Sequence, residues 1–210
     1  MANIKMAVEE LHKAFHFLNK HKFNSELPEP AIVIQNQGKH KNTYGWCSID
    51  PIWNDSEREE KKHEITICAE YLNRPLYQLM STLLHEMVHL HNILNGIKDV
   101  SRGNTYHNKK FKQTAEERGL IITFNEKIGW SISELNEESK ALIDTFDLNE
   151  EAFTIARMGF HAEGKAKKKS SMRKYICPEC GQSIRATKEI NVICGDCDVP
   201  FLLEETEDED

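Results

Sequence analysis

The most constraining stretch of this sequence is LYQLMSTLLHEMVHLHNILN, residues 76–95. It contains His85-Glu86-x-x-His89, a spacing that places two imidazoles one turn apart on the same side of a helix. On a helical wheel at about 100° per residue, Asn92 lies beside these histidines. Five leucines cluster on the opposite side: Leu76, Leu79, Leu83, Leu90 and Leu94. The stretch therefore predicts a buried helix with a core face and a metal face.

The residues around this stretch favour the same interpretation. Pro75 stands where the first turn of a helix tolerates proline, and Gly96 follows the last periodic residue. The alternative is an amphipathic helix with two surface histidines, but the apolar run argues against it. Neutral imidazole suits Zn²⁺, and the Glu86 carboxylate can act as a base toward a metal-bound water.

Composition places the chain among water-soluble globular proteins. Its 210 residues are 39% hydrophobic and 29% charged, enough for one sizeable core and a small appendage. No apolar run has the length of a signal peptide or a membrane span, so we expect a cytoplasmic protein without a membrane partner. Six cysteines in such a chain indicate metal ligands or free thiols rather than disulfides.

The formal charge of −7 hides a strong segregation of charge. Residues 165–174 hold six basic groups and no acid, whereas residues 204–210 hold six acids and no base. The basic segment is either a solvated linker or a contact to the phosphate backbone of DNA. The acidic tail either competes with nucleic acid for that segment or keeps the protein soluble.

The pattern before the metal helix predicts one helix and a small sheet. Apolar residues recur at helical spacing from Ile4 to Leu18, with Asn3 as the N-cap. Three strands are predicted, over residues 31–34, 44–49 and 65–68, with residues 54–62 as a charged connector. We expect an α+β fold in which a three-stranded antiparallel sheet packs against the first helix and the HExxH helix.

After Gly96 the pattern predicts a polar loop over residues 98–106 and then a helix over residues 108–118, ended by Gly119. Ser133 is the predicted N-cap of a further helix carrying Leu135, Leu142, Ile143 and Phe146, and Asn149 that of a short one.

A catalytic zinc usually has three protein ligands, so a third must be found outside the helix. His91 lies about 200° around the helix from His89 and points away. His107 is the better candidate, because a loop can return it to the metal face; Glu116 and Glu117 are the alternatives. The remaining histidines lie in polar or basic surroundings and are predicted to be surface residues: His12, His16, His21, His40, His63 and His161.

Several pieces in one order resemble the SprT-like (SprT/Spartan) zinc metallopeptidase family, over roughly residues 3–125. They are Phe23-Asn24-x-x-Leu27-Pro28, Tyr44-Gly45, residues 82–89 (TLLHEMVH) and His107-x-x-x-Phe111. This order and spacing are far more specific than HExxH alone. One departure is Asn108, where family members commonly have glycine; asparagine also tolerates left-handed backbone.

The resemblance implies a zinc-dependent endopeptidase. It makes His85, His89 and His107 the ligands of a catalytic zinc and Glu86 the catalytic base, which activates a zinc-bound water. The implied substrate is protein, including protein associated with or crosslinked to DNA. Tyr106, next to the third ligand, is a candidate for stabilising the oxyanion.

Four cysteines near the C-terminus form a second metal candidate. Cys177-x-x-Cys180 and Cys194-x-x-Cys197 are separated by thirteen residues, a pattern typical of a structural zinc in a ribbon. Glycines at 181 and 195 are predicted to permit the two tight turns, and residues 183–187 to form a hairpin with residues 190–193. The alternatives are two redox dithiols or two disulfides. Cys47 and Cys68 are predicted to be buried free thiols in strands.

The predicted organisation is a metallopeptidase domain over 1–160, a basic linker over 161–174, a zinc ribbon over 175–203 and an acidic tail over 204–210. Two other functions stay open. One is a non-enzymatic zinc protein that binds DNA or a partner, and the other is metal-dependent hydrolysis of a non-peptide substrate.

Overall fold

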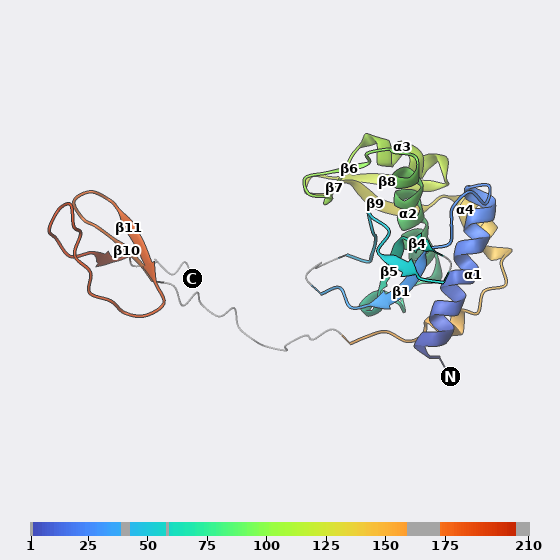
Figure 1. Ribbon diagram of the computed structural model, residues 1–210, viewed down its shortest axis with the longest axis horizontal. Helices are drawn as coiled ribbons and strands as arrows, with labels where there is room; N and C mark the ends of the chain where they lie inside the picture. The colour runs from blue at the N-terminus through green and yellow to red at the C-terminus, as the bar shows by residue number, and fades with distance from the viewer. Residues whose placement is uncertain (1, 39–42, 58, 159–172, 205–210) are drawn as a thin grey trace. The chain divides into compact units, whose positions relative to one another are not determined.

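The computed structural model describes residues 2–38, 43–57, 59–158 and 173–204. The chain divides into two compact units, residues 1–159 and 160–210, shown with their helices and strands in Figure 1. The fold is a mixture of α-helices and small sheets, as predicted. Most of the predicted basic linker and residues 205–210 of the predicted acidic tail lie outside the described residues.

The first helix, α1 (Ile4–Lys22), begins at the predicted N-cap. The Asn3 side chain accepts a hydrogen bond of 3.0 Å from the backbone N–H of Met6, which satisfies one donor left free by the helix. Leu11, Phe15 and Leu18 are fully or almost fully buried, so the apolar face of α1 is part of the core.

The first sheet has the order β1–β5–β2 and is mixed, not antiparallel as predicted. β1 (Ala31–Gln35) pairs with β5 (Glu64–Cys68) in parallel, and β2 (Gly45–Cys47) pairs with β5 in antiparallel register. Every residue of β5 is buried, which explains its central place between the other two strands. β1 and β2 are therefore the two edge strands of this sheet, and β5, the last of the three in the sequence, lies between them.

The predicted charged connector also contains structure. β3 (Trp53–Asp55) and β4 (Glu60–Lys62) form a two-stranded antiparallel hairpin, and the 3₁₀ helix η1 (Ala69–Tyr71) follows β5. The hairpin residues are exposed or half-buried. The sequence did not predict this hairpin, because both strands carry charged side chains and lack the alternation of apolar and polar residues that indicates a strand.

The helix that carries the HExxH sequence, α2 (Leu76–Leu94), begins after Pro75 and ends two residues before Gly96. It packs against β2 and β5 of the first sheet and also against β9 and α3 (Figure 1). Leu79, Leu83 and Leu90 are fully buried on the core face. No helix within the described ranges is long and apolar enough to cross a membrane.

A second sheet follows α2 and was not predicted. Its order is β6 (Val100–Ser101), β7 (Tyr106–His107), β9 (Gly129–Leu135) and β8 (Leu120–Asn125). The residues of β8 alternate between buried and exposed over Leu120–Thr123, the period-2 signal of a half-buried strand. The helix α3 (Lys109–Glu117) connects β7 to β8.

The prediction of a helix capped by Ser133 was wrong, because Ser133 lies within β9. The helix α4 (Glu137–Asp144) begins later, where the Asn136 side chain accepts a 2.8 Å hydrogen bond from the backbone N–H of Ser139. Asn149 precedes a single 3₁₀ turn, η2 (Glu150–Phe153), and makes no side-chain capping bond.

The second unit contains a three-stranded antiparallel sheet in the order β11–β10–β12. β10 (Arg173–Ile176) pairs with β11 (Ser183–Ala186) on one edge and with β12 (Leu202–Leu203) on the other. The predicted hairpin between residues 183–187 and 190–193 was therefore wrong: β11 pairs with the strand before the first cysteine pair.

The core face of α2 generates a stability prediction. Leu83→Ala removes a fully buried side chain and should lower the free energy of unfolding by about 2–5 kcal/mol. Leu94 was also predicted on the core face, but it is 45% exposed, so Leu94→Ala should cost less than about 1 kcal/mol. Urea denaturation followed by tryptophan fluorescence measures this, since all three tryptophans lie in residues 1–159. Equal losses in the two variants would contradict the assigned core face.

Candidate functional site

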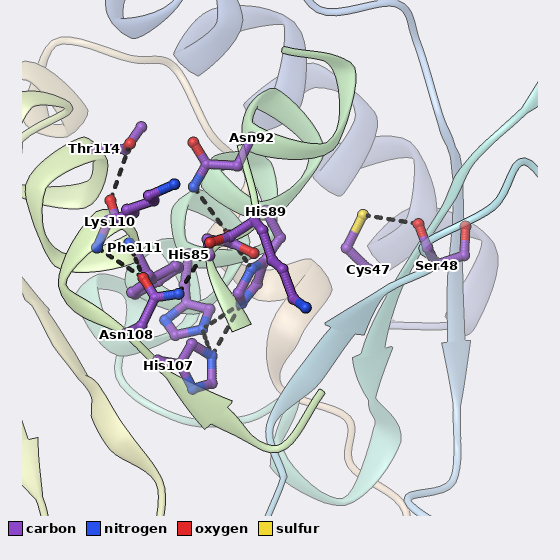
Figure 2. Close-up of polar contacts among 12 residues, drawn as sticks. Cys47, Ser48, His85, His89, Asn92, His107, Asn108, Lys110, Phe111 and Thr114 are labelled. Atoms are coloured by element: carbon purple, nitrogen blue, oxygen red, sulfur yellow. Dashed lines mark hydrogen bonds and ion pairs between the residues drawn. The ribbon is translucent and has the colours of Figure 1, made fainter. Parts of the chain in front are cut away.

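Three histidines from two elements meet at one point in the first unit. His85 and His89 project from α2, and His107 ends β7, where its backbone N–H donates to the carbonyl of Ile128 over 2.9 Å. Their Nε2 atoms are 3.2 Å (His85 to His107), 3.2 Å (His85 to His89) and 3.0 Å (His89 to His107) apart. Figure 2 shows the three rings facing one another.

The opposite nitrogen of each ring has its own partner. His85 Nδ1 lies 3.1 Å from Ser133 Oγ, His89 Nδ1 lies 2.7 Å from Asp99 Oδ2, and His107 Nδ1 lies 3.3 Å from the carbonyl of Ile128. A carboxylate and a carbonyl only accept hydrogen bonds, so Nδ1 carries the proton in His89 and His107. In the neutral rings of His89 and His107, each Nε2 then carries a lone pair instead of a proton, and the two lone pairs face each other.

Lone pairs 3.0 Å apart repel each other unless a cation lies between them. The separations are close to the roughly 3.3 Å expected between nitrogens of a tetrahedral zinc site. Burial, followed by the neighbouring His89 charge, lowers the pKa of His85 well below its ordinary value and that of His107 to about 4. Both rings are therefore neutral at pH 7, the form that binds metal. The cluster can hold a divalent cation.

Asp99 orients the second histidine. It is 3% exposed, and its Oδ2 accepts hydrogen bonds from His89 Nδ1 and, over 2.9 Å, from the side chain of Asn92. Burial alone would raise the pKa of Asp99, but the hydrogen bonds from His89 and Asn92 outweigh it and lower that pKa. Such partners fix the tautomer and direction of a ligating ring.

Glu86 lies against β2. A Cβ at Gly45 would lie 2.7 Å from the backbone carbonyl of Thr66 and 3.3 Å from Glu86 Oε1, so the neighbouring strand requires glycine here and the carboxylate lies close to it. Burial raises the pKa of Glu86 to about 7. A carboxyl group with this pKa can both accept and release a proton near neutral pH.

Asn108, the departure from the family pattern, has extended backbone (φ −94°, ψ −175°), not the left-handed conformation considered from sequence. Its side chain caps α3 by accepting hydrogen bonds from the N–H groups of Lys110 and Phe111 (Figure 2). Its amide nitrogen also donates to the carbonyl of Lys98 over 2.9 Å. Asparagine at this position thus begins the helix that follows His107.

The other candidates lie elsewhere. His91 packs on the ring of Phe23 with 5.6 Å between centroids, away from the cluster as predicted. Glu116 and Glu117 are exposed on α3, where Glu116 pairs with Lys112 and Glu117 accepts a hydrogen bond from Gln113. The ring of Tyr106 packs on the guanidinium of Arg102 at 4.3 Å.

Sequence reasoning missed Asp99 and Ser133 and gave Asn92 no role. One signal was available for Asp99, because it is the sole carboxylate between His89 and His107 in the sequence. Ser133 carried no such signal. It reaches His85 only through the second sheet, which the sequence pattern did not predict.

The four C-terminal cysteines come together in the second unit. One Sγ atom from each lies within 4.8 Å of the others, and Cys180 Sγ is 3.7 Å from Cys194 Sγ. That separation is far too long for a disulfide but close to the roughly 3.8 Å expected between sulfurs of a tetrahedral zinc site. The backbone N–H of Cys180 lowers the pKa of the Cys177 thiol to about 7, whereas contacts with neighbouring thiols raise the pKa values of Cys180 and Cys197.

The two cysteine turns have different residues at the equivalent position, four residues after the first cysteine of each turn. Gly181 and Asp198 each donate a backbone hydrogen bond to the first cysteine of their turn, Cys177 and Cys194, over 3.0 and 2.8 Å. Both donors have left-handed backbone, with φ of +72° and +57°. The prediction that Gly195 permits the second turn was wrong, since Asp198 takes the left-handed position.

The remaining two cysteines lie in strands of the first sheet and are free, as predicted. Cys68 is buried, as predicted, whereas Cys47 is only half-buried. Burial raises the pKa of the Cys68 thiol to about 12 and also raises that of the Cys47 thiol. Both are therefore protonated at neutral pH and packed as small apolar groups.

Removal of the Asp99 charge tests its role. Asp99→Asn should weaken metal binding at the histidine cluster by about 10- to 100-fold, measured by competition with a chromophoric zinc chelator. Asp50→Asn is the control, because Asp50 is exposed and should leave the affinity unchanged. An unaltered affinity in Asp99→Asn would show that His89 needs no carboxylate to orient it.

Comparison with known proteins agrees with this site. A family model described as SprT-like family matches residues 11–127, more than half of the chain and all three histidines. No curated protein and no solved structure matches the chain. The family is generally a metallopeptidase-type domain, and the matched residues include α2, β7 and α3. The chain belongs to the SprT-like family.

Proposed function

We propose that this chain is a zinc-dependent metalloendopeptidase. His85, His89 and His107 are the proposed ligands of a catalytic zinc, and Glu86 is the proposed general base. The observation that carries the proposal is the convergence of three Nε2 atoms within 3.0–3.2 Å of one another beside a buried carboxylate. A purely structural site has no need of a base at that position.

A zinc ion held by His85, His89 and His107 would act as a Lewis acid, lowering the pKa of a bound water and polarising the scissile carbonyl. The Glu86 carboxylate accepts a proton from the attacking water and delivers it to the leaving amine. Asp99, Ser133 and the carbonyl of Ile128 hold the three rings in place throughout.

The second proposed zinc is structural and is bound by Cys177, Cys180, Cys194 and Cys197. The sheet β11–β10–β12 is small, and few of its residues are buried. Metal binding can supply the folding free energy that such a small core lacks. This ribbon completes the proposed division into residues 1–160, 161–174, 175–203 and 204–210.

The proposed substrate is protein, including protein associated with or crosslinked to DNA. Two basic residues from neighbouring strands, Lys174 and Arg185, are register partners in the ribbon, and Arg173 is exposed beside them. Together with residues 165–172 they would form a sequence-independent contact to phosphates. All six cysteines are free, which agrees with the cytoplasm as the proposed compartment.

Two competing functions make different predictions. A non-enzymatic zinc protein would bind DNA or a partner and hydrolyse nothing. A hydrolase of non-peptide substrates would share the metal and Glu86 but would leave peptide bonds intact. The buried Glu86 beside the histidines favours an enzyme, and membership of the SprT-like family favours a peptidase.

Metal stoichiometry tests the two proposed sites. At nanomolar free zinc the intact chain should hold two zinc ions, and His107→Ala and Cys177→Ser should each hold about one, because the two sites share no ligand. Elemental analysis after dialysis measures this. An undiminished metal content in His107→Ala would contradict the assignment of His107 as the third ligand.

Replacement of the base tests the mechanism. Glu86→Gln should keep its zinc and lose about 10²- to 10⁴-fold in the rate of peptide hydrolysis, assayed on a DNA-bound protein with and without DNA. Glu117→Gln is the control, since Glu117 is exposed on α3, and should keep full activity. Undiminished cleavage by Glu86→Gln would contradict the mechanism. If the wild type cleaves nothing with or without DNA, the result would favour the non-enzymatic zinc protein that binds DNA or a partner.

A further inference from the structure

A third group of metal-binding side chains lies on α1, apart from both proposed zinc sites. His12 and His16 are one turn apart on this helix, and Glu29 lies in the segment before β1. Glu29 Oε1 is 2.9 Å from His12 Nδ1 and 3.2 Å from His16 Nε2. All three ligand atoms lie within 4.8 Å of one another.

The backbone that carries Glu29 is fixed on both sides. Before it, the buried Asn19 side chain donates to the carbonyl of Leu27 over 2.9 Å and accepts from its N–H over 3.2 Å. After it, Ala31 enters β1, where its N–H donates to the carbonyl of His63 over 2.8 Å. Glu29 itself stands between Pro28 and Pro30, which restrict the backbone further.

The helix that carries the two histidines is equally fixed. Leu11 and Phe15, the residues directly before His12 and His16, are fully buried in the core. The three polar side chains stay accessible to solvent, with exposures of 30% for His12, 58% for His16 and 43% for Glu29. The ligand set is therefore largely preorganised, which reduces the entropy lost on binding.

The chemistry of the set selects the kind of cation. Burial would raise the pKa of Glu29, but hydrogen bonds from His12 and His16 lower it overall, so the carboxylate is ionised at neutral pH. Two imidazoles and one carboxylate suit zinc and its neighbours nickel and copper. Magnesium and calcium prefer a shell of oxygens, and this set provides one carboxylate.

We propose that His12, His16 and Glu29 form a third divalent-cation site, open to solvent and selective for zinc-like ions over magnesium. The ion would replace the hydrogen bonds that now join the histidines to Glu29 and would link α1 to the segment before β1. Water would occupy its remaining coordination positions, so we expect weaker binding than at the two enclosed sites. The proposal does not depend on the proposed function, because no ligand is shared.

The test is calorimetric titration of the full chain with zinc, beginning with both enclosed sites filled at nanomolar free zinc. The wild type should bind one further equivalent in the micromolar range. His16→Gln and Glu29→Gln should weaken this step at least 10-fold. His21→Gln, an exposed histidine of α1 outside the cluster, should leave it unchanged. Circular dichroism establishes that the variants are folded.

A second measurement uses stability in place of stoichiometry. Micromolar zinc should raise the thermal midpoint of the wild type and of His21→Gln, read by tryptophan fluorescence, but not that of His16→Gln or Glu29→Gln. Magnesium should change none of them. The proposal is overturned if the wild type binds no third equivalent, if the two cluster variants retain it, or if magnesium competes for it.

Discussion

The convergence of three imidazole Nε2 atoms is the constraint on which the first unit depends. Left to themselves, neutral rings at 3.0–3.2 Å would move apart, so each must be held from its far side. The holding groups come from three places: the loop after α2 provides Asp99, β9 provides Ser133, and the turn before β9 provides the carbonyl of Ile128. The second sheet therefore positions the three histidines as well as covering the core.

The sequence was most informative where one residue type has one physical use. The HExxH spacing, the cysteine pairs, Asn3 as an N-cap and the order of the family pieces each correspond to a definite geometry. Strand pairing was less accessible. The local sequence does not show whether β1 pairs with a parallel or an antiparallel strand. That pairing depends on the position of β5, which is fully buried and lies between the other two strands of the sheet.

Among the groups that hold the histidines, some have a signal in the local sequence and others depend on the tertiary structure alone. Asp99 could have been inferred from its place between His89 and His107, but Ser133 lies 48 residues after His85 and meets it only because β9 packs on α2. Similarly, the left-handed position in the second cysteine turn belongs to Asp198 and not to the nearby Gly195. Such roles follow from tertiary placement, and composition does not reveal them.

The hydrogen bonds at Asn108 have a consequence for how chains of this kind can vary. The backbone N–H of Asn108 donates to the carbonyl of Asp99 over 2.9 Å, and its side chain donates to Lys98, so both ends of the excursion over residues 100–107 are tied together. We therefore expect a change in the length of its tip, which carries left-handed Arg102 and Asn104, to leave His107 in place. The hydrogen bonds at the base of the loop thus fix the distance in space between His89 and His107. We expect this distance to be independent of the number of residues in the loop.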